Sequence, residues 1–277
     1  RNFAMSIIAV VLGSPVSHSL SPAIHRAAFV AAGRAGDYSA IECQATTLEA
    51  TLISLRDGGA IGASITMPLK EDVITHLSAL SDTAKELNAV NCVVFAEGQV
   101  IGHNTDGDGC CDALVEQGGV DLSNTSVVLL GGGGTARAIA LSVLRHGAQV
   151  IVVNRTTEKA DSMVRSLSSY GHITVGSVAD LAHADVLVNA TSVGMNSTES
   201  PVDASLLHSG LTVLDAVYSP METTLLAAAR RAGCVAVDGL WMLIHQARHQ
   251  QILWFGQNPS AEVMRSAAEQ ELASLRK

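Results

Sequence analysis

The chain of 277 residues is long enough for two domains of ordinary size, each with a buried core. Its composition, 48% hydrophobic and 16% charged, is typical of globular proteins and argues against a disordered chain. A formal net charge of −9 and an aromatic content of 3% argue against nucleic-acid binding, which uses basic surfaces and stacking rings. We therefore expect a protein that acts on small molecules.

Neither a membrane segment nor an export signal is predicted. No apolar run reaches the ~20 residues that a membrane helix needs, and residues 1–5 lack the regions of a signal peptide. We therefore expect a cytoplasmic protein that binds no membrane. The histidines form no HExxH pair, so no metal is expected, and His18, His25, His245 and His249 are interpreted as surface or packing residues. The cysteines show no CxxC pairing, and we expect reduced thiols at Cys43, Cys92, Cys110, Cys111 and Cys234.

Short β-branched runs alternate with Ala/Leu-rich stretches along most of the chain. This alternation predicts an α/β fold with largely parallel sheets, because parallel neighbours need crossover helices. In the first part we expect strands at residues 6–12 and 61–66, a helix at residues 22–32, and a hairpin of residues 90–96 and 100–102 around Glu97-Gly98.

A second βαβ series follows a boundary near residue 107. Its strands are expected at residues 126–130, 149–153, 173–175, 186–189, 211–215 and 235–237. Helical patterns at residues 240–255 and 261–275 end the sequence. We expect these last helices to return to the first domain and to leave a cleft between the two domains.

A glycine-rich turn opens the second series. The apolar residues 127–130 lead directly into four glycines, Gly131 to Gly134, and then into an Ala-rich helix. Gly131, Gly133 and Ala136 occupy the three small positions of the dinucleotide fingerprint, which allow a tight turn and close approach of backbone N–H groups to a pyrophosphate. The strand-turn-helix context therefore predicts dinucleotide binding.

The end of the next strand indicates which dinucleotide. An NAD site usually places a carboxylate here for the ribose 2′-hydroxyl, whereas this chain has Asn154, Arg155 and Thr156. A guanidinium suits bidentate contact with a 2′-phosphate. The alternative is an ordinary surface arginine. The sequence favours NADP over NAD.

Three polar segments interrupt the apolar strands of the first half. Ser19 and Ser21 can point the same way from an extended backbone and suit a carboxylate, although Ser21 also fits a helix N-cap before Pro22. Lys70 follows the strand that ends near residue 66, where α/β active sites usually lie. Asp106 closes the third segment. Taken singly, a lysine such as Lys70 is more often a solvated side chain, and an aspartate such as Asp106 more often caps a helix.

Together, these segments resemble the shikimate dehydrogenase family over nearly the whole chain. The motifs that carry the resemblance are residues 17–22, 66–70 and 104–107, the glycine turn with Arg137, residues 154–156, 189–195 and 215–218, Pro220, Thr223, Leu225, and residues 239–243 with Gln246. The resemblance implies an N-terminal α/β substrate domain (residues 1–106 and 240–277) and a Rossmann-type NADP-binding domain (residues 107–239).

The resemblance also implies roles for individual residues. Lys70 and Asp106 would form the catalytic pair, and Ser19 and Ser21 would hold the substrate carboxylate. Ring hydroxyls would be bound by Thr66, Asn91, Asp106 and Gln246, with Tyr218 lining the same cleft. The cofactor would contact Gly131, Gly132, Gly133, Gly134, Thr135, Asn154, Arg155, Thr156, Thr191, Ser192, Gly239 and Met242. The implied reaction is the reduction of 3-dehydroshikimate to shikimate with NADPH, in the pathway leading to aromatic amino acids.

The chemistry agrees with these residue types. Reduction of a ketone leaves an alkoxide-like oxygen that needs a proton and a nearby positive charge. Lys70 can supply both, while Asp106 can orient it and hydrogen-bond the substrate. We expect Lys70→Ala to lower kcat far more than it changes KM.

Two departures from the family pattern leave the substrate open. Ser64 and Ile65 replace the usual Asn-Val before Thr66, and Cys92 stands where a threonine commonly follows Asn91. A quinate/shikimate or aminoshikimate dehydrogenase of broader specificity is therefore an alternative, although Ser21 favours shikimate. A catalytically silent NADP-binding sensor is another, and the presence of both Lys70 and Asp106 argues against it. We expect a monomer or a homodimer.

Overall fold

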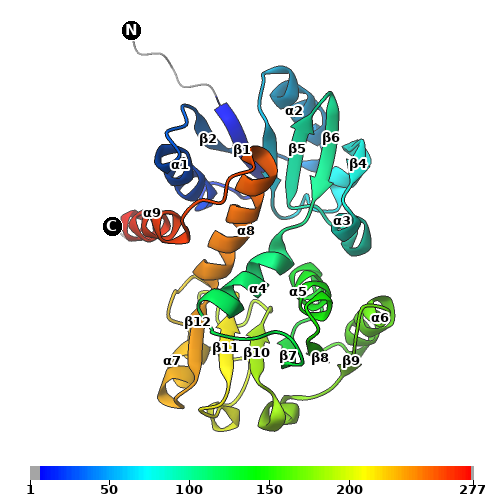
Figure 1. Ribbon diagram of the computed structural model, residues 1–277, viewed down its shortest axis with the longest axis vertical. Coiled ribbons are helices and arrows are strands. Elements are labelled where there is room, and N and C mark those ends of the chain that lie inside the picture. The colour runs from blue at the N-terminus through cyan, green and yellow to red at the C-terminus, as the bar shows by residue number, and fades with distance from the viewer. Residues whose placement is uncertain (1–6, 276–277) are drawn as a thin grey trace. The chain divides into compact units, whose positions relative to one another are not determined.

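The computed structural model describes residues 7–275, so the expectations for residues 1–6 and the last two residues lie outside it. Its internal contacts divide the chain into two compact units (Figure 1). Unit 1 runs to Thr105 and resumes at Ala247, and unit 2 is Asp106–Gln246. The boundary between Gln246 and Ala247 falls inside one long helix, α8 (Gly239–Phe255).

Unit 1 contains a mixed six-stranded sheet of order β2-β1-β3-β5-β6-β4. Its elements are β1 (Ile7–Gly13), α1 (Ser21–Ala31), β2 (Asp37–Glu42), α2 (Ala45–Asp57), β3 (Gly62–Ile65), η1 (Asp72–His76), β4 (Ala79–Leu80), α3 (Asp82–Leu87), β5 (Cys92–Ala96), β6 (Gln99–His103) and α9 (Ala261–Ser274). The central strand β1 pairs in parallel with β2 and β3, and its residues Ala9 to Leu12 are at most 2% exposed. Such a strand reads as a continuous apolar run because both of its faces are covered.

The C-terminal end of the chain packs within unit 1. Helix α9 lies against α1 (Figure 1), and Trp254 of α8 donates its indole N–H to the Val93 carbonyl at 3.0 Å. The predicted return of the last helices to the first domain is therefore confirmed. The hairpin β5–β6 is also confirmed, and both Glu97 and Gly98 have positive φ, as the tight turn between twisted strands requires.

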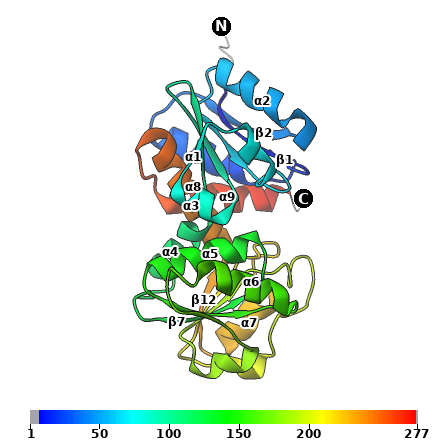
Figure 2. The same cartoon turned by 90° about the vertical axis from the view of Figure 1, so that its right-hand side faces the viewer.

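Unit 2 contains a fully parallel six-stranded sheet of order β12-β11-β10-β7-β8-β9. Its elements are α4 (Asp106–Glu116), β7 (Ser126–Leu130), α5 (Gly134–Arg145), β8 (Gln149–Val153), α6 (Thr157–Leu167), β9 (Ile173–Val175), η2 (Val178–His183), β10 (Val186–Asn189), η3 (Ala204–Leu206), β11 (Thr212–Asp215), α7 (Thr224–Arg231), β12 (Val235–Asp238) and the first part of α8. Numbered within the unit, the strand order is 3-2-1-4-5-6, which is the dinucleotide-binding arrangement. Helices α5 and α6 lie beside one another in Figure 2.

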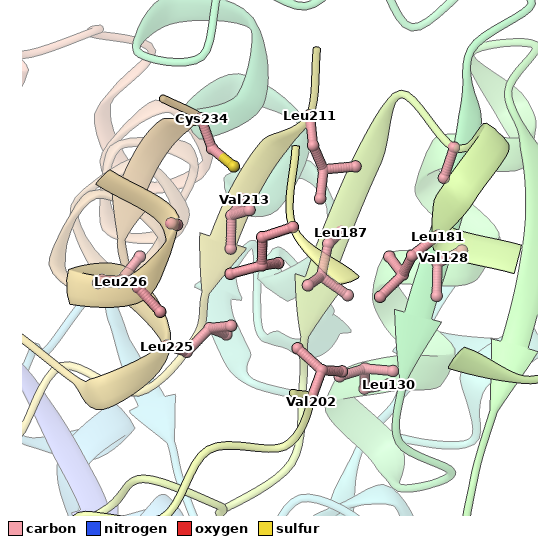
Figure 3. Close-up of a cluster of buried hydrophobic side chains, with 14 residues drawn as sticks. Val128, Leu130, Leu181, Leu187, Val202, Leu211, Val213, Leu225, Leu226 and Cys234 are labelled. Atoms are coloured by element: carbon pink, nitrogen blue, oxygen red, sulfur yellow. The ribbon is translucent and has the colours of Figure 1, made fainter. Parts of the chain in front are cut away.

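One core cluster of unit 2 joins the sheet to α7. Figure 3 shows Val128, Leu187 and Val213, from three neighbouring strands, on the side that faces Leu225 and Leu226. All five side chains are at most 1% exposed. Each fully buried side chain of this kind contributes about 1.5–3 kcal/mol to the stability of the fold. The cluster therefore stabilises the sheet, and with it the turns at the carboxyl edge of the sheet.

Among residues 7–275, no helix is long and apolar enough to cross a membrane. The five cysteines are buried and carry free thiols, as predicted. The predicted N-cap role of Ser21 is wrong. Helix α1 begins at Ser21 itself and its N-cap is Leu20, whose side chain has no acceptor atom, so no side chain caps the helix.

Candidate active site

Three of the substrate residues predicted in unit 1 follow two parallel strands that pair with each other, β1 and β3. Beyond β1, the Ser19 hydroxyl accepts the backbone N–H of Ser21 at 3.2 Å, and both side chains are half-buried. Beyond β3, Thr66 donates its backbone N–H to the Leu12 carbonyl at 2.9 Å. The carboxyl edge of a parallel sheet is where α/β proteins bind ligands, so these segments lie where a site is expected.

The backbone around Lys70 is fixed on both sides. Leu69, which is fully buried, anchors the turn, and the Lys70 carbonyl accepts the Val90 N–H at 2.8 Å. At Gly13, an added Cβ would lie 2.3 Å from the Thr66 methyl group, so only glycine lets the two segments approach this closely. The half-buried Lys70 therefore extends from a rigid turn next to the strand that follows Val90.

Asn91 is buried and is bound to the segment that precedes Asp106. Its amide oxygen accepts the Thr105 N–H at 2.8 Å, and its amide nitrogen donates to the Thr105 hydroxyl at 3.0 Å. Asn104 is held in a similar way, through the Ala89 carbonyl at 3.1 Å. Asp106 follows Thr105 directly, as the half-buried first residue of α4.

Unit 2 holds the remaining predicted site residues, beginning with the glycine turn. Gly131 has φ of +127°, and a Cβ there would lie 3.1 Å from the Ala190 carbonyl oxygen. At Gly133 and Gly134, by contrast, an added Cβ would meet nothing within 4 Å. Helix α5 begins at Gly134 without a side-chain cap, so its first N–H groups can bind an anion. Thr135 follows in the first turn of this helix, and its side chain is half-buried.

A second helix start that can bind an anion follows β8. A Cβ at Gly132 would come within 2.9 Å of the Asn154 side-chain nitrogen, and that nitrogen donates to the Thr156 carbonyl at 2.8 Å. Helix α6 has Thr156 as its N-cap, again without a side-chain cap, and Arg155 beside it is exposed. A positive helix end next to a guanidinium suits a phosphate group, so these residues fit NADP.

The loops after β10 and β11 share one buried carboxylate. Asp215 accepts hydrogen bonds from the Asn189 amide at 2.9 Å, the Val217 N–H at 3.1 Å and the Thr223 hydroxyl at 2.7 Å. Burial raises the pKa of Asp215, and these hydrogen bonds oppose the increase. The Asn189 oxygen in turn accepts the Thr191 hydroxyl at 2.7 Å. Next to these anchors, Ser192 is exposed, and Tyr218 is half-buried with its pKa raised by burial.

The start of α8 packs tightly within unit 2. A Cβ at Gly239 would lie 2.5 Å from the Ala216 carbonyl oxygen, and one at Gly109 would lie 2.6 Å from the Gln246 nitrogen. Met242 is buried, and Gln246 donates its amide to the Leu243 carbonyl at 2.9 Å. Thus Ser19, Ser21, Thr66, Lys70 and Asn91 belong to unit 1, and the other predicted site residues belong to unit 2.

Two clusters of polar side chains were not anticipated from the sequence. Asp112, Glu116 and His245 place ligand atoms within 4.8 Å of one another, and His245 Nε2 already bonds Gln117 at 2.7 Å. The i, i+4 spacing of Asp112 and Glu116 places both carboxylates on one face of α4, and the sequence alone shows this spacing. Their partner His245 lies 129 positions after Glu116. In unit 1, Tyr38 and Gln250 form a buried polar network, whose members carry no local motif.

Comparison with known proteins gives a consistent result. Residues 11–93 match the shikimate dehydrogenase substrate binding domain, residues 113–202 match shikimate / quinate 5-dehydrogenase, and residues 239–269 match the shikimate 5'-dehydrogenase C-terminal domain. The shikimate dehydrogenase (NADP(+)) of Thermococcus kodakarensis is 42% identical over 93% of this chain and 94% of its own length. That of Pyrococcus abyssi is 41% identical over 95% and 97%.

Solved structures agree with the sequence relatives. Shikimate 5-dehydrogenase from Thermus thermophilus, in complex with NADP(H) and shikimate, superimposes with a TM-score of 0.88 at 35% identity, covering 96% of this chain and 99% of that one. Quinate dehydrogenase from Corynebacterium glutamicum, in complex with NAD, gives a TM-score of 0.87 at 33% identity with the same coverage.

Proposed function

The chain belongs to the shikimate dehydrogenase family, and from this premise we propose that it transfers a hydride between shikimate and NADP. The reaction interconverts shikimate and 3-dehydroshikimate. The proposal rests mainly on the polar side chains, including Lys70, at the carboxyl edge of the sheet of unit 1. In the same chain, the sheet of unit 2 has the dinucleotide-binding strand order. Residues 1–106 and 240–277 form the proposed substrate domain, and residues 107–239 form the proposed nucleotide domain.

NADP, when bound, supplies or accepts the hydride. The N–H groups at the start of α5 are proposed to hold its pyrophosphate, with Gly133 and Gly134 leaving the turn open to it. Arg155, Asn154 and Thr156 are proposed to hold the 2′-phosphate at the start of α6. The proposed cofactor contacts are completed by Gly131, Gly132, Thr135, Thr191, Ser192, Gly239 and Met242.

On the substrate side, Ser19 and Ser21 are proposed to bind the carboxylate. Ser19 and Ser21 lie two positions apart where the chain enters α1, which allows two hydroxyls to bind one anion. Thr66, Asn91, Asp106 and Gln246 are proposed to bind ring hydroxyls, and Tyr218 to line the same site.

Lys70 and Asp106 are the proposed catalytic pair. The Lys70 ammonium would give a proton to the substrate oxygen as the carbonyl is reduced, and its charge would stabilise the developing alkoxide. Asp106 would orient the ammonium and accept a hydrogen bond from the substrate. General acid catalysis of this kind contributes about 10²- to 10⁴-fold in rate.

Initial rates of nicotinamide reduction with shikimate and with quinate, each with NADP and with NAD, test this function. Fast turnover only with shikimate and NADP is the expected result. Comparable rates with quinate would favour the broader enzyme, an alternative supported by the likeness to a quinate dehydrogenase. NADP binding without turnover of either substrate would instead favour an aminoshikimate dehydrogenase or a silent sensor. We further propose that the enzyme is a cytoplasmic monomer or homodimer, in keeping with its five free thiols.

A further inference from the structure

One carboxylate of unit 1 binds the loop that joins β1 to α1, residues 14–20. Glu42 is the last residue of β2, and it pairs in register with Gly13, the last residue of β1. Its two carboxylate oxygens accept separate hydrogen bonds from the loop, one from the Ser14 hydroxyl at 2.5 Å and one from the Val16 N–H at 3.3 Å. A single side chain therefore holds the loop at two positions.

The first of these positions, Ser14, is fixed from both sides of β1. A carboxylate accepts hydrogen bonds, so the Ser14 hydroxyl is the donor in its bond with Glu42. The same hydroxyl oxygen accepts the side-chain amide of Gln44 at 2.9 Å. On the other side, the Ser14 N–H donates to the Met67 carbonyl at 3.1 Å. The start of the loop is thus bound to the segments that follow β2 and β3.

From the second position, hydrogen bonds lead on to the two serines proposed for the substrate carboxylate. The Val16 N–H donates to Glu42, and the Val16 carbonyl accepts the Ser19 N–H at 3.0 Å. The Ser19 hydroxyl oxygen accepts the Ser21 N–H at 3.2 Å, which leaves its hydrogen to be donated to an anion. All these bonds except the first lie within the segment from Val16 to Ser21, so Glu42 attaches the series to the sheet.

Packing around Val16 complements this series. Val16 is 4% exposed and lies in one core cluster with Val11 of β1 and Phe29 of α1. Its side chain therefore keeps the middle of the loop against the core. The peptide groups on either side of Val16 are oriented by hydrogen bonds, one to Glu42 and one to Ser19.

The exposure of Glu42 decides where its effect should appear. Hydrogen bonds of an exposed side chain contribute little to the free energy of unfolding, because water replaces them. A ligand site is more sensitive, since its groups have to be held within about 0.5 Å of their productive positions. Loss of Glu42 should therefore weaken substrate binding while unit 1 stays folded.

We propose that Glu42 is a positioning residue for substrate binding, which holds the loop so that Ser19 and Ser21 present their hydroxyls to the substrate carboxylate. It acts through the Ser14 hydroxyl and the Val16 N–H. This role rests on the proposed function, because it requires that the two serines bind shikimate.

Steady-state kinetics of Glu42→Ala with shikimate at saturating NADP tests the role. We expect KM for shikimate to rise about three- to tenfold, as for the loss of one hydrogen bond. We expect kcat and the KM for NADP to change less than twofold. Glu49→Ala is the matched control, since Glu49 is an exposed glutamate of α2 in the same unit, and all its constants should stay unchanged.

Glu42→Gln separates geometry from charge. The amide has the size of the carboxylate but no charge, and its oxygen can still accept one of the two bonds from the loop. We therefore expect Glu42→Gln to raise KM less than Glu42→Ala does. If Glu42 acted on shikimate only by charge repulsion, both substitutions would instead lower KM to the same extent.

A double-mutant cycle locates the effect in the loop. Ser14→Ala removes one of the two bonds to Glu42 and should also raise KM selectively. In a background that carries both Ser19→Ala and Ser21→Ala, Glu42→Ala should lower kcat/KM for shikimate no further, because the hydroxyls that it positions are absent.

Three results would overturn the proposal. The first is a KM that is lowered, or within twofold of the unmutated protein, in both Glu42→Ala and Ser14→Ala. The second is a full additional loss from Glu42→Ala in the background without the two serines. The third is a lower kcat per total enzyme at unchanged KM, which indicates loss of folded protein. Failure of the proposed function would be visible separately, as absence of shikimate turnover by the unmutated protein, and would remove the positioning role with it.

Discussion

Acidification should destabilise unit 1 because of one buried histidine. His25 is fully buried, and its ring stacks on Tyr38 at 4.4 Å and lies 5.2 Å from the ring of Trp254. Its Nδ1 is 2.7 Å from the Gln251 amide nitrogen, which is a donor, so Nδ1 accepts and the proton lies on Nε2. Burial lowers the pKa of His25 from 6.5 to about 3.

The sign and the size of the effect follow from linkage. The unfolded chain takes up a proton near pH 6.5 and the folded protein does not, so the free energy of unfolding falls as the pH drops from 6.5 towards about 3. At 1.36 kcal/mol per pH unit, the complete loss amounts to about 5 kcal/mol. Between pH 8 and pH 5, the expected loss is about 2 kcal/mol.

Urea unfolding at pH 8 and at pH 5, followed by the fluorescence of Trp254, measures this loss. A Trp241→Phe background removes the second tryptophan and makes the signal specific for unit 1. His25→Asn offers an oxygen near the position of Nδ1 but does not titrate, so it should lose about 2 kcal/mol less than the parent between the two pH values. His183→Asn, at an exposed position in unit 2, should behave like the parent. An equal loss in His25→Asn and the parent would refute the reasoning.

Three further predictions concern unit 2. Arg155→Gln should weaken NADP binding about ten- to a hundredfold, because charge-assisted bonds of roughly 1.5–3 kcal/mol are lost, whereas NAD binding should change little. Titration of the variant with both nucleotides measures this difference. Equal weakening of NADP and NAD binding would exclude a contact with the 2′-phosphate. Asp215→Ala should cost about 2–4 kcal/mol in urea unfolding, since it leaves buried donors of Asn189 and Val217 without an acceptor. Because burial raises the pKa of Asp215, the free energy of unfolding of the parent should fall as pH rises through that pKa. Asp215→Asn does not titrate and should remove this fall. A similar fall in Asp215→Asn would show that other groups cause the pH dependence.

Local pattern was sufficient for most of the second sheet and for part of the first. Strands β7 to β10 have the bounds expected from the sequence. For β7 and β10 the reason is that strands buried on both faces contrast sharply with their turns. Strand β2 had no such contrast and was not anticipated. It lies at the edge of its sheet, and its apolar residues are interrupted by Ser39 and flanked by Asp37 and Glu42.

Long-range contacts explain the remaining differences. The bond between Ser64 and Gln250 joins positions 186 residues apart, and no spacing rule connects them. Ser21 fitted an N-cap by residue type, but the helix begins one residue earlier than that role requires. Motif order along the chain located the candidate site, whereas the partners that hold its side chains became visible only in the folded structure.

The most direct test of the account is the turnover of shikimate with NADP by Lys70→Ala, measured beside Lys85→Ala. Lys85 is an exposed lysine of α3 in the same unit, paired with Asp82 at 4.0 Å, and its substitution should leave the rate unchanged. For Lys70→Ala we expect kcat to fall by about 10²- to 10⁴-fold, with a much smaller change in KM. A near-normal kcat in Lys70→Ala would contradict the proposed catalytic role of Lys70 and, with it, the proposed site.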